Sequence, residues 1–102
     1  MARQMKKYED DLATRLKDQD YAVEYLNAVL EDEGDDQQER FLMALKDVAK
    51  AHGIANIAHD SKVTREALYR VLSEKGNPEL ATLLSVLSAL GLKLKVATDE
   101  AS

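Results

Sequence analysis

The sequence predicts a single all-α domain of five helices that ends in a short C-terminal β-strand. Three observations support this fold class. The chain has 102 residues, a length that suits one domain. Its four glycines and one proline give few of the turn signals that strands and hairpins need. Its apolar residues recur mainly at spacings of three and four, the period of a helix.

The first nineteen residues form an N-terminal extension that we expect to be partly ordered. Tyr8, Leu12 and Leu16 have a four-residue spacing that allows a short helix there. The main domain, residues 20–97, then begins with a helix at about 20–32. Its apolar side chains fall on adjoining helical rows, and Gly34 ends it.

Four further helices are expected. Phe41, Leu42, Leu45, Val48 and Ala49 form the apolar stripe of a helix at 36–52. Two shorter helices follow at 54–60 and 64–74, with residues 61–63 between them. Residues 76–78, Gly-Asn-Pro, stop the second of these, and an almost fully apolar helix follows at 79–90. The aromatic residues Tyr21, Tyr25 and Phe41 are expected in the core or in a dimer interface.

The last part of the chain alternates apolar and polar residues, which predicts a strand. Leu92, Leu94 and Val96 alternate with Lys93 and Lys95. The sequence offers this strand no partner, and a two-fold dimer would supply one. Residues 98–102 are expected to be a disordered tail.

Composition and charge exclude several classes of protein. The chain has no cysteine, so neither a disulfide nor a thiolate zinc site is expected. It has no long apolar run, so we expect no membrane association and, without a secretory signal, a cytoplasmic location. The net charge is −5, with −6 in residues 1–40 and +3 in residues 41–95. The acidic part suits a basic partner, and the basic part suits nucleic acid.

Residues 54–73 have the pattern of a helix-turn-helix motif. The expected inward-facing residues are Ile54, Ile57, Ala58, Val63, Ala67, Leu68, Val71 and Leu72. Lys62 occupies the turn position that glycine often holds, and a left-handed lysine costs about 1 kcal/mol relative to glycine. We therefore expect a turn wider than the tightest version.

The outward face of the second helix carries residue types that read a DNA groove. Arginine can bond guanine edges or phosphates with two N–H groups, and threonine or tyrosine can contact phosphates or thymine methyls. Glu66 can accept from cytosine or hold Arg70. The candidate DNA-binding residues are Lys62, Thr64, Arg65, Glu66, Tyr69, Arg70, Ser73, Lys75 and Asn77.

The same residues also have plainer interpretations. Two short amphipathic helices with a brief turn often form an ordinary packing corner, and Arg65 and Arg70 can be solvated surface charges. His52 and His59 lack a third ligand nearby, so we expect no metal site. No catalytic constellation and no cofactor motif can be identified, which indicates a protein that is not an enzyme.

From residue 21 to residue 96 the chain resembles the HigA-like antitoxins, which are addiction-module antidote proteins. The resemblance rests on residues 25–30, 41–49, 64–73, 76–78, 82–84 and 87–92. It implies a lambda-repressor-like helix-turn-helix domain. It also implies an antitoxin that neutralises a small basic toxin of the RelE/ParE type. Such a protein binds double-stranded operator DNA as a homodimer to repress its own operon.

Two other functions remain open at this point. The chain can be a stand-alone helix-turn-helix repressor with no toxin, whose acidic half only keeps it in solution. It can also be a protein-binding module that has lost DNA binding, which the sequence pI of about 5.0 favours.

Overall fold

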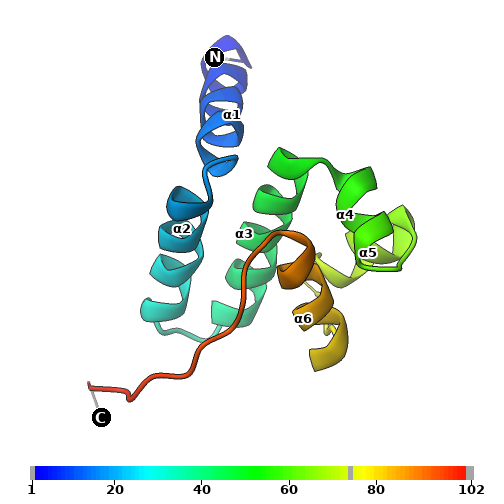
Figure 1. Ribbon diagram of the computed structural model, residues 1–102. Helices are drawn as coiled ribbons and strands as arrows, with labels where there is room; N and C mark the ends of the chain where they lie inside the picture. Colours follow the sequence, from blue (N-terminus) through cyan, green and yellow to red (C-terminus); the bar gives the residue numbers. More distant parts are fainter. Residues whose placement is uncertain (1, 74, 101–102) are drawn as a thin grey trace.

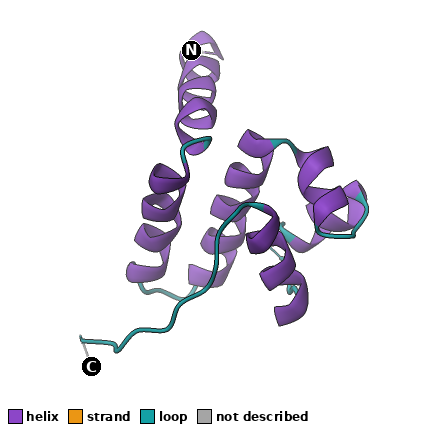
Figure 2. Cartoon of the chain, in the orientation of Figure 1, coloured by secondary structure: helices purple, strands orange, loops and turns teal. Residues whose placement is uncertain are grey.

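The computed structural model describes residues 2–73 and 75–100, which contain six helices and no strand (Figures 1 and 2). The helices are α1 (Ala2–Leu16), α2 (Gln19–Glu31), α3 (Gln37–His52), α4 (Ile54–Asp60), α5 (Arg65–Val71) and α6 (Leu80–Ala89). The all-helical class is as predicted, and the five expected helices lie within a few residues of α2 to α6. The additional helix is α1, which contains Tyr8, Leu12 and Leu16.

The helix ends follow from local chemistry. Asp18 caps α2, because its carboxylate accepts a 2.9 Å hydrogen bond from the backbone N–H of Asp20. Gly53 separates α3 from α4 with a φ of 100°, a value that side chains with a Cβ rarely adopt. The chain therefore turns sharply at Gly53 and places α4 beside the end of α3.

The hydrophobic core is organised around α3, which packs against α1, α2 and α4, while α6 packs against α4. Figure 1 shows α3 between the α1–α2 side and the α4–α5 side of the molecule. The largest fully buried side chains come from along the whole chain: Leu16, Leu45, Val48, Leu68, Leu72 and Val86. One core therefore joins the acidic N-terminal part to the basic middle part.

Two side chains attach α1 and α2 to distant parts of the chain. The ring Nε2 of His52, at the end of α3, donates a 3.1 Å hydrogen bond to the carbonyl of Leu16. The amide of Gln19 donates at 3.2 Å to the carbonyl of Leu90, just after α6. Each bond satisfies a carbonyl at a helix end that has no partner within its own helix.

The predicted C-terminal β-strand is wrong. Residues 92–99 are a non-helical segment that belongs to no strand, and Figure 2 draws them as loop across the face of the bundle. A strand is stabilised by pairing with another strand, and the described part of this chain contains none. Leu92 packs against the core, whereas Leu94 and Val96 are exposed. Residues 101 and 102 of the expected tail lie outside the described residues.

Over the described residues, none of the helices has the length and apolar character needed to cross a lipid bilayer.

Candidate nucleic-acid interface

A tight turn joins α4 to α5. The N–H of Lys62 donates to the carbonyl of His59 at 3.1 Å, and the N–H of Val63 donates to the carbonyl of Ala58 at 3.0 Å. These two bonds form the Schellman motif, in which one left-handed residue reverses the chain after a helix. Val63, which follows, packs against the core. The Ser61 hydroxyl is buried and has no hydrogen-bond partner among the described residues.

Lys62 is the left-handed residue of this turn, with a φ of 62°. Our expectation of a wider turn is therefore wrong. The turn has the compact geometry that a glycine would give, and the left-handed backbone conformation of Lys62 is strained. Its side chain is exposed at the junction between the two helices.

The sequence of α5 explains why the helix presents its polar side outward. Thr64 caps it, because the threonine hydroxyl accepts a 3.0 Å hydrogen bond from the N–H of Ala67. Leu68 and Leu72 are completely buried, and Ala67 and Val71 are partly buried. The predicted inward face of this helix is confirmed. Its four buried or partly buried residues fix the rotation of α5 about its axis.

The structure brings five candidate residues together on the exposed side of this helix. Thr64, Arg65, Glu66 and Arg70 are exposed, and Tyr69 is 38% exposed. Lys62 lies just before them in the turn. Tyr69 therefore presents part of its ring and its hydroxyl to solvent, a geometry compatible with a contact to sugar, phosphate or base.

The remaining candidates follow the helix in a less regular segment. The hydroxyl of Ser73 donates to the carbonyl of Arg70 at 2.9 Å and is partly buried, so it is engaged in ending the helix. Lys75 and Asn77 are exposed. Between them, the carbonyl of Gly76 accepts a 3.4 Å hydrogen bond from the amide of Gln38 on α3. Residue 74, the last of the predicted helix, lies outside the described residues.

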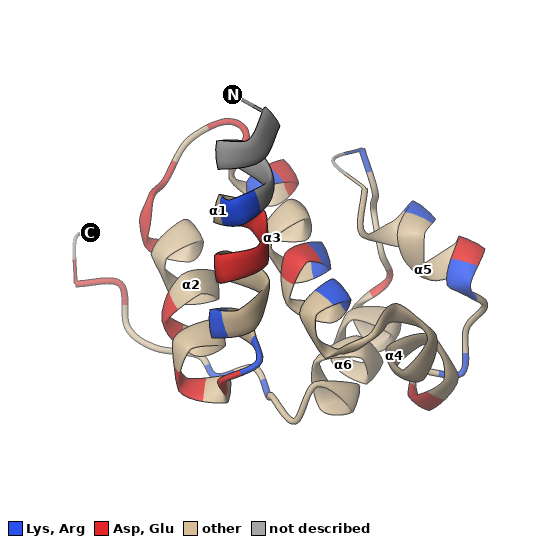
Figure 3. Ribbon diagram, turned by 90° about the horizontal axis from the view of Figure 1, so that it is seen from above, with Lys and Arg blue, Asp and Glu red and all other residues tan. Residues whose placement is uncertain are grey.

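Charge on α5 is mixed. Figure 3 shows blue and red segments close together on this helix and on α1, and red segments on α2 and in the α2–α3 connection. Within the described part of the chain, Glu66 makes no ion pair with Arg70. From the sequence we expected that Glu66 could hold Arg70. Because neither Arg65 nor Arg70 forms an ion pair among the described residues, both are available to an external partner.

We did not anticipate the polar contacts that fix the α2–α3 connection and join α2 to α3. The guanidinium of Arg40 contacts Asp32 at 2.9 Å and Asp36 at 3.0 Å. Partial desolvation acts to lower the pKa of Arg40, but the bonds to Asp36 and Asp32 outweigh it and raise that pKa.

The Tyr25 hydroxyl on α2 donates a 2.8 Å hydrogen bond to Asp47 on α3. No local sequence pattern indicates this bond, because it forms only once the two helices are paired.

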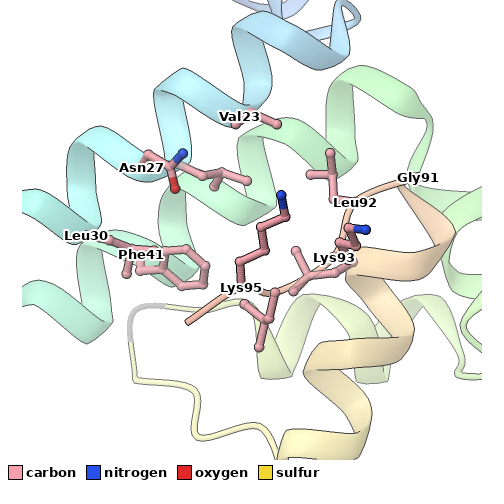
Figure 4. Close-up of a pocket in the computed structure, with 11 residues that line it drawn as sticks. Val23, Asn27, Leu30, Phe41, Gly91, Leu92, Lys93 and Lys95 are labelled. Carbon is pink, nitrogen blue, oxygen red and sulfur yellow. The ribbon is translucent and has the colours of Figure 1, made fainter. Parts of the chain in front are cut away.

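A hollow of about 320 Å³ lies between α2 and α3 and is lined in part by Tyr25, Val29, Glu39, Met43 and Asp47. A larger one, of about 500 Å³, lies between α2 and the C-terminal segment. Figure 4 shows the larger hollow, with Val23, Asn27 and Leu30 on one side and Leu92, Lys93 and Lys95 on the other. Neither hollow includes a residue of α5, so both are separate from the candidate interface.

The two histidines lie in different environments. His52 is partly buried and bonded to Leu16, whereas His59 is exposed and lies 3.3 Å from Asp60. The described residues contain no cluster of three or more histidine, cysteine, aspartate or glutamate side chains with metal-binding geometry.

Comparison with known proteins identifies the family. A family model described as "Probable addiction module antidote protein" matches residues 4–98. An uncharacterized protein of Haemophilus influenzae Rd is 38% identical over 96 residues, which is 94% of each chain. No solved structure matches the chain. Because the family model covers nearly the whole chain, including the six helices almost in full, this protein belongs to the family of probable addiction module antidote proteins.

Proposed function

We propose that this chain is a cytoplasmic antitoxin with two activities. It binds and neutralises a small basic toxin of the RelE/ParE type, and it binds operator DNA as a homodimer to repress its own operon. The single observation that carries the proposal is the family match over residues 4–98, since an antidote implies a toxin partner.

The DNA-binding activity rests on α4 and α5, which we propose act as a helix-turn-helix motif. Arg65 and Arg70 are exposed on a helix whose other side is fixed in the core by Leu68 and Leu72. A helix with a fixed rotation presents the same side chains to the groove in every complex, as base recognition requires. Lys62 and Lys75 lie beyond the two ends of α5 and would contact phosphates.

The toxin-binding activity is proposed for the acidic N-terminal part. Residues 1–40 carry a net charge of −6, and the acidic excess comes from α2 and the α2–α3 connection, because residues 19–36 contain seven Asp or Glu and no Lys or Arg (Figure 3). Surfaces of opposite sign accelerate encounter and exclude wrong partners. Because the acidic residues lie on helices other than α5, toxin and DNA can be held by different parts of the molecule.

The homodimer is proposed because operators of this kind are read as two half-sites. A dimer would place two copies of α5 in successive major grooves, about 34 Å or a multiple of that distance apart. Each good contact from Arg65 or Arg70 to a base would contribute roughly 1–3 kcal/mol of discrimination.

The proposal is tested by co-expressing the tagged chain with the neighbouring reading frame and determining the mass of the purified complex. A small basic protein in fixed stoichiometry supports the antitoxin activity. A dimer that retains no partner but shifts its own promoter fragment would reduce the function to a stand-alone repressor.

The DNA-binding activity is tested with a double variant, Arg65→Ala with Arg70→Ala, in a promoter-shift assay. The matched control is Arg15→Ala with Lys17→Ala, which removes two exposed cations near the end of α1. We expect the first variant to lose operator binding and the control to keep it. Unchanged binding by the first variant would show that α5 does not read the operator. If the wild-type protein itself binds no promoter DNA, the result would favour a pure protein-binding module.

A further inference from the structure

The hollow between α2 and the C-terminal segment has an apolar floor and an open side. Leu26 and Leu87 are buried at its base, and Phe41 is partly buried beside them. Val23 and Leu30 on α2 form one wall, and residues 91–95 form the other (Figure 4). We call this feature the α2/C-terminal groove.

The rim of the α2/C-terminal groove exposes large apolar side chains to solvent. Val23 is 40% exposed, Leu30 45%, Leu94 43%, and the adjoining Val96 is 100% exposed. Single exposed apolar residues are ordinary, but several around one hollow indicate a surface that another molecule covers. Since these side chains come from both walls, a partner would contact α2 and the C-terminal segment together.

The two walls carry charges of opposite sign. Lys93 and Lys95 line the C-terminal wall and are exposed. Glu24 and Glu31 directly follow Val23 and Leu30, so each lies about 100° further round α2, on its solvent side. Among the described residues, none of these four side chains forms an ion pair within the chain. The groove therefore has acidic side chains along its α2 side and basic side chains along its C-terminal side, and the Lys95 side chain reaches over the apolar floor (Figure 4).

This arrangement, acidic on one side and basic on the other, is self-complementary. In a dimer whose two-fold axis runs along the groove, the acidic side of each copy meets the basic side of the other. We propose that the α2/C-terminal groove is the homodimer interface, a proposal that rests on the homodimer in the proposed function. Lys93 and Lys95 of one protomer then face Glu24 and Glu31 of the other, and the apolar rims cover each other.

The basic edge also explains why a second copy fits this groove better than the toxin. A basic toxin would meet Lys93 and Lys95 with charge of the same sign, and like charges placed together disfavour binding. The groove includes no residue of α5 and none of the acidic α2–α3 connection, residues 32–36. Dimerisation through it therefore leaves the candidate DNA-binding residues uncovered, and that connection remains for the toxin.

The experiment is a charge reversal followed by its rescue, with the dimer dissociation constant measured by sedimentation equilibrium. Glu24→Lys with Glu31→Lys places four like charges across the interface, and we expect the constant to rise by about tenfold or more. Adding Lys93→Glu and Lys95→Glu to the same chain restores opposite signs. We expect that quadruple variant to dimerise nearly as well as the wild type.

An apolar pair of variants checks the centre of the groove. Leu30→Asp should weaken the dimer, whereas Leu80→Asp on α6 should not, although Leu80 is the more exposed residue at 64%. Both side chains lie at the surface, so circular dichroism should report unchanged helix content for each. The Leu80 variant also tests α6 as a competing interface.

Four outcomes would overturn the inference, and they separate it from the proposed function. A dimer that tolerates the Glu24 and Glu31 reversal, or one that only Leu80→Asp disrupts, refutes the groove but leaves the homodimer standing. A reversal that weakens the dimer without rescue refutes the charge pairing. A wild-type chain that is monomeric at every concentration refutes both the groove and the homodimer, while toxin capture in the co-expression experiment is decided separately.

Discussion

The hydroxyl of Tyr25 on α2 donates a 2.8 Å hydrogen bond to the carboxylate of Asp47 on α3. The bond joins two residues that lie 22 positions apart and sits near one end of the hollow between the helices. Arg40, bonded to Asp32 and Asp36, lies near the other end. Together these polar contacts define how the acidic helix α2 lies on the central helix α3.

Removing the Tyr25 hydroxyl should destabilise the fold modestly. Tyr25→Phe keeps the ring that packs against the core but leaves Asp47 without this donor. Because both residues are only partly buried, water can replace the lost donor, and we expect the free energy of unfolding to fall by about 1 kcal/mol. Urea denaturation measures the change. Tyr8→Phe, at a residue that is 70% exposed, is the control and should have no measurable effect.

The same bond should make stability depend on alkaline pH. Burial, and then the hydrogen bond and charge of Asp47, raise the pKa of Tyr25 above its ordinary value. The stabilisation is therefore complete below the unfolded pKa of about 10 and is lost as pH rises above it. Urea denaturation between about pH 9 and about pH 11 should show a steeper loss of stability for the wild type than for Tyr25→Phe. Parallel pH profiles would contradict this account.

Thr64 should contribute to stability as the cap of α5. Thr64→Ala removes the hydroxyl that accepts from Ala67, and a lost cap costs roughly 0.5–2 kcal/mol. Thr64→Ser keeps the hydroxyl and should restore most of that loss. Thermal denaturation of the two variants distinguishes the contribution of the capping hydroxyl to stability from that of the methyl group. Equal destabilisation by both substitutions would show that the hydroxyl is not the cause.

Lys62 should have opposite effects on folding and on DNA binding. Lys62→Gly relieves the left-handed strain at φ 62° and should stabilise the protein by about 0.5–1 kcal/mol. Lys62→Ala keeps the strain and should not. Both substitutions remove the same charge, so both should lower the salt dependence of operator affinity by about one unit of slope. Fluorescence anisotropy at several salt concentrations would measure this, and an unchanged slope would remove Lys62 from the interface.

Gly76 should not tolerate a side chain. A Cβ at this position would overlap the backbone carbonyl of Val71 at the end of α5, and a backbone atom cannot move aside cheaply. We expect Gly76→Ala to reduce the free energy of unfolding by roughly 1–3 kcal/mol. The control is Gly34→Ala, where a Cβ would make only ordinary contacts with the side chains of Arg40 and Asp36. A normally stable Gly76→Ala variant would contradict the close approach.

The helices were largely predictable because their signals are local. A cap such as Thr64, a stop such as residues 76–78, and an apolar row such as Leu68 and Leu72 each specify a helix from a few neighbouring residues. The same reasoning correctly predicted the inward face of α5. Whether its outward residues bind DNA is not decided by the fold, and that assignment stays a prediction.

Most of the features that sequence reasoning missed depend on contacts between distant residues. The alternation of Leu92, Leu94 and Val96 indicates a strand only if another strand lies alongside, and periodicity carries no information about that partner. The bonds from Tyr25 to Asp47 and from His52 to Leu16 require the relative positions of whole helices. The turn at Lys62 was misjudged because core packing of Val63 and the helix-ending hydrogen bonds hold a conformation that lysine alone disfavours.

The hydrogen bond from Gln19 to the carbonyl of Leu90 spans 71 positions of the chain. The stretch between its two ends contains α2 to α6. The candidate DNA-binding helix α5 therefore lies within a segment whose ends meet only when the start of α2 contacts the end of α6. We therefore expect the molecule to unfold as one cooperative unit, with amide hydrogen exchange in α2 and α4 reporting the same opening event. A protease that cleaves the unfolded state would then abolish toxin binding and DNA binding together, and no cleavage fragment would retain either activity.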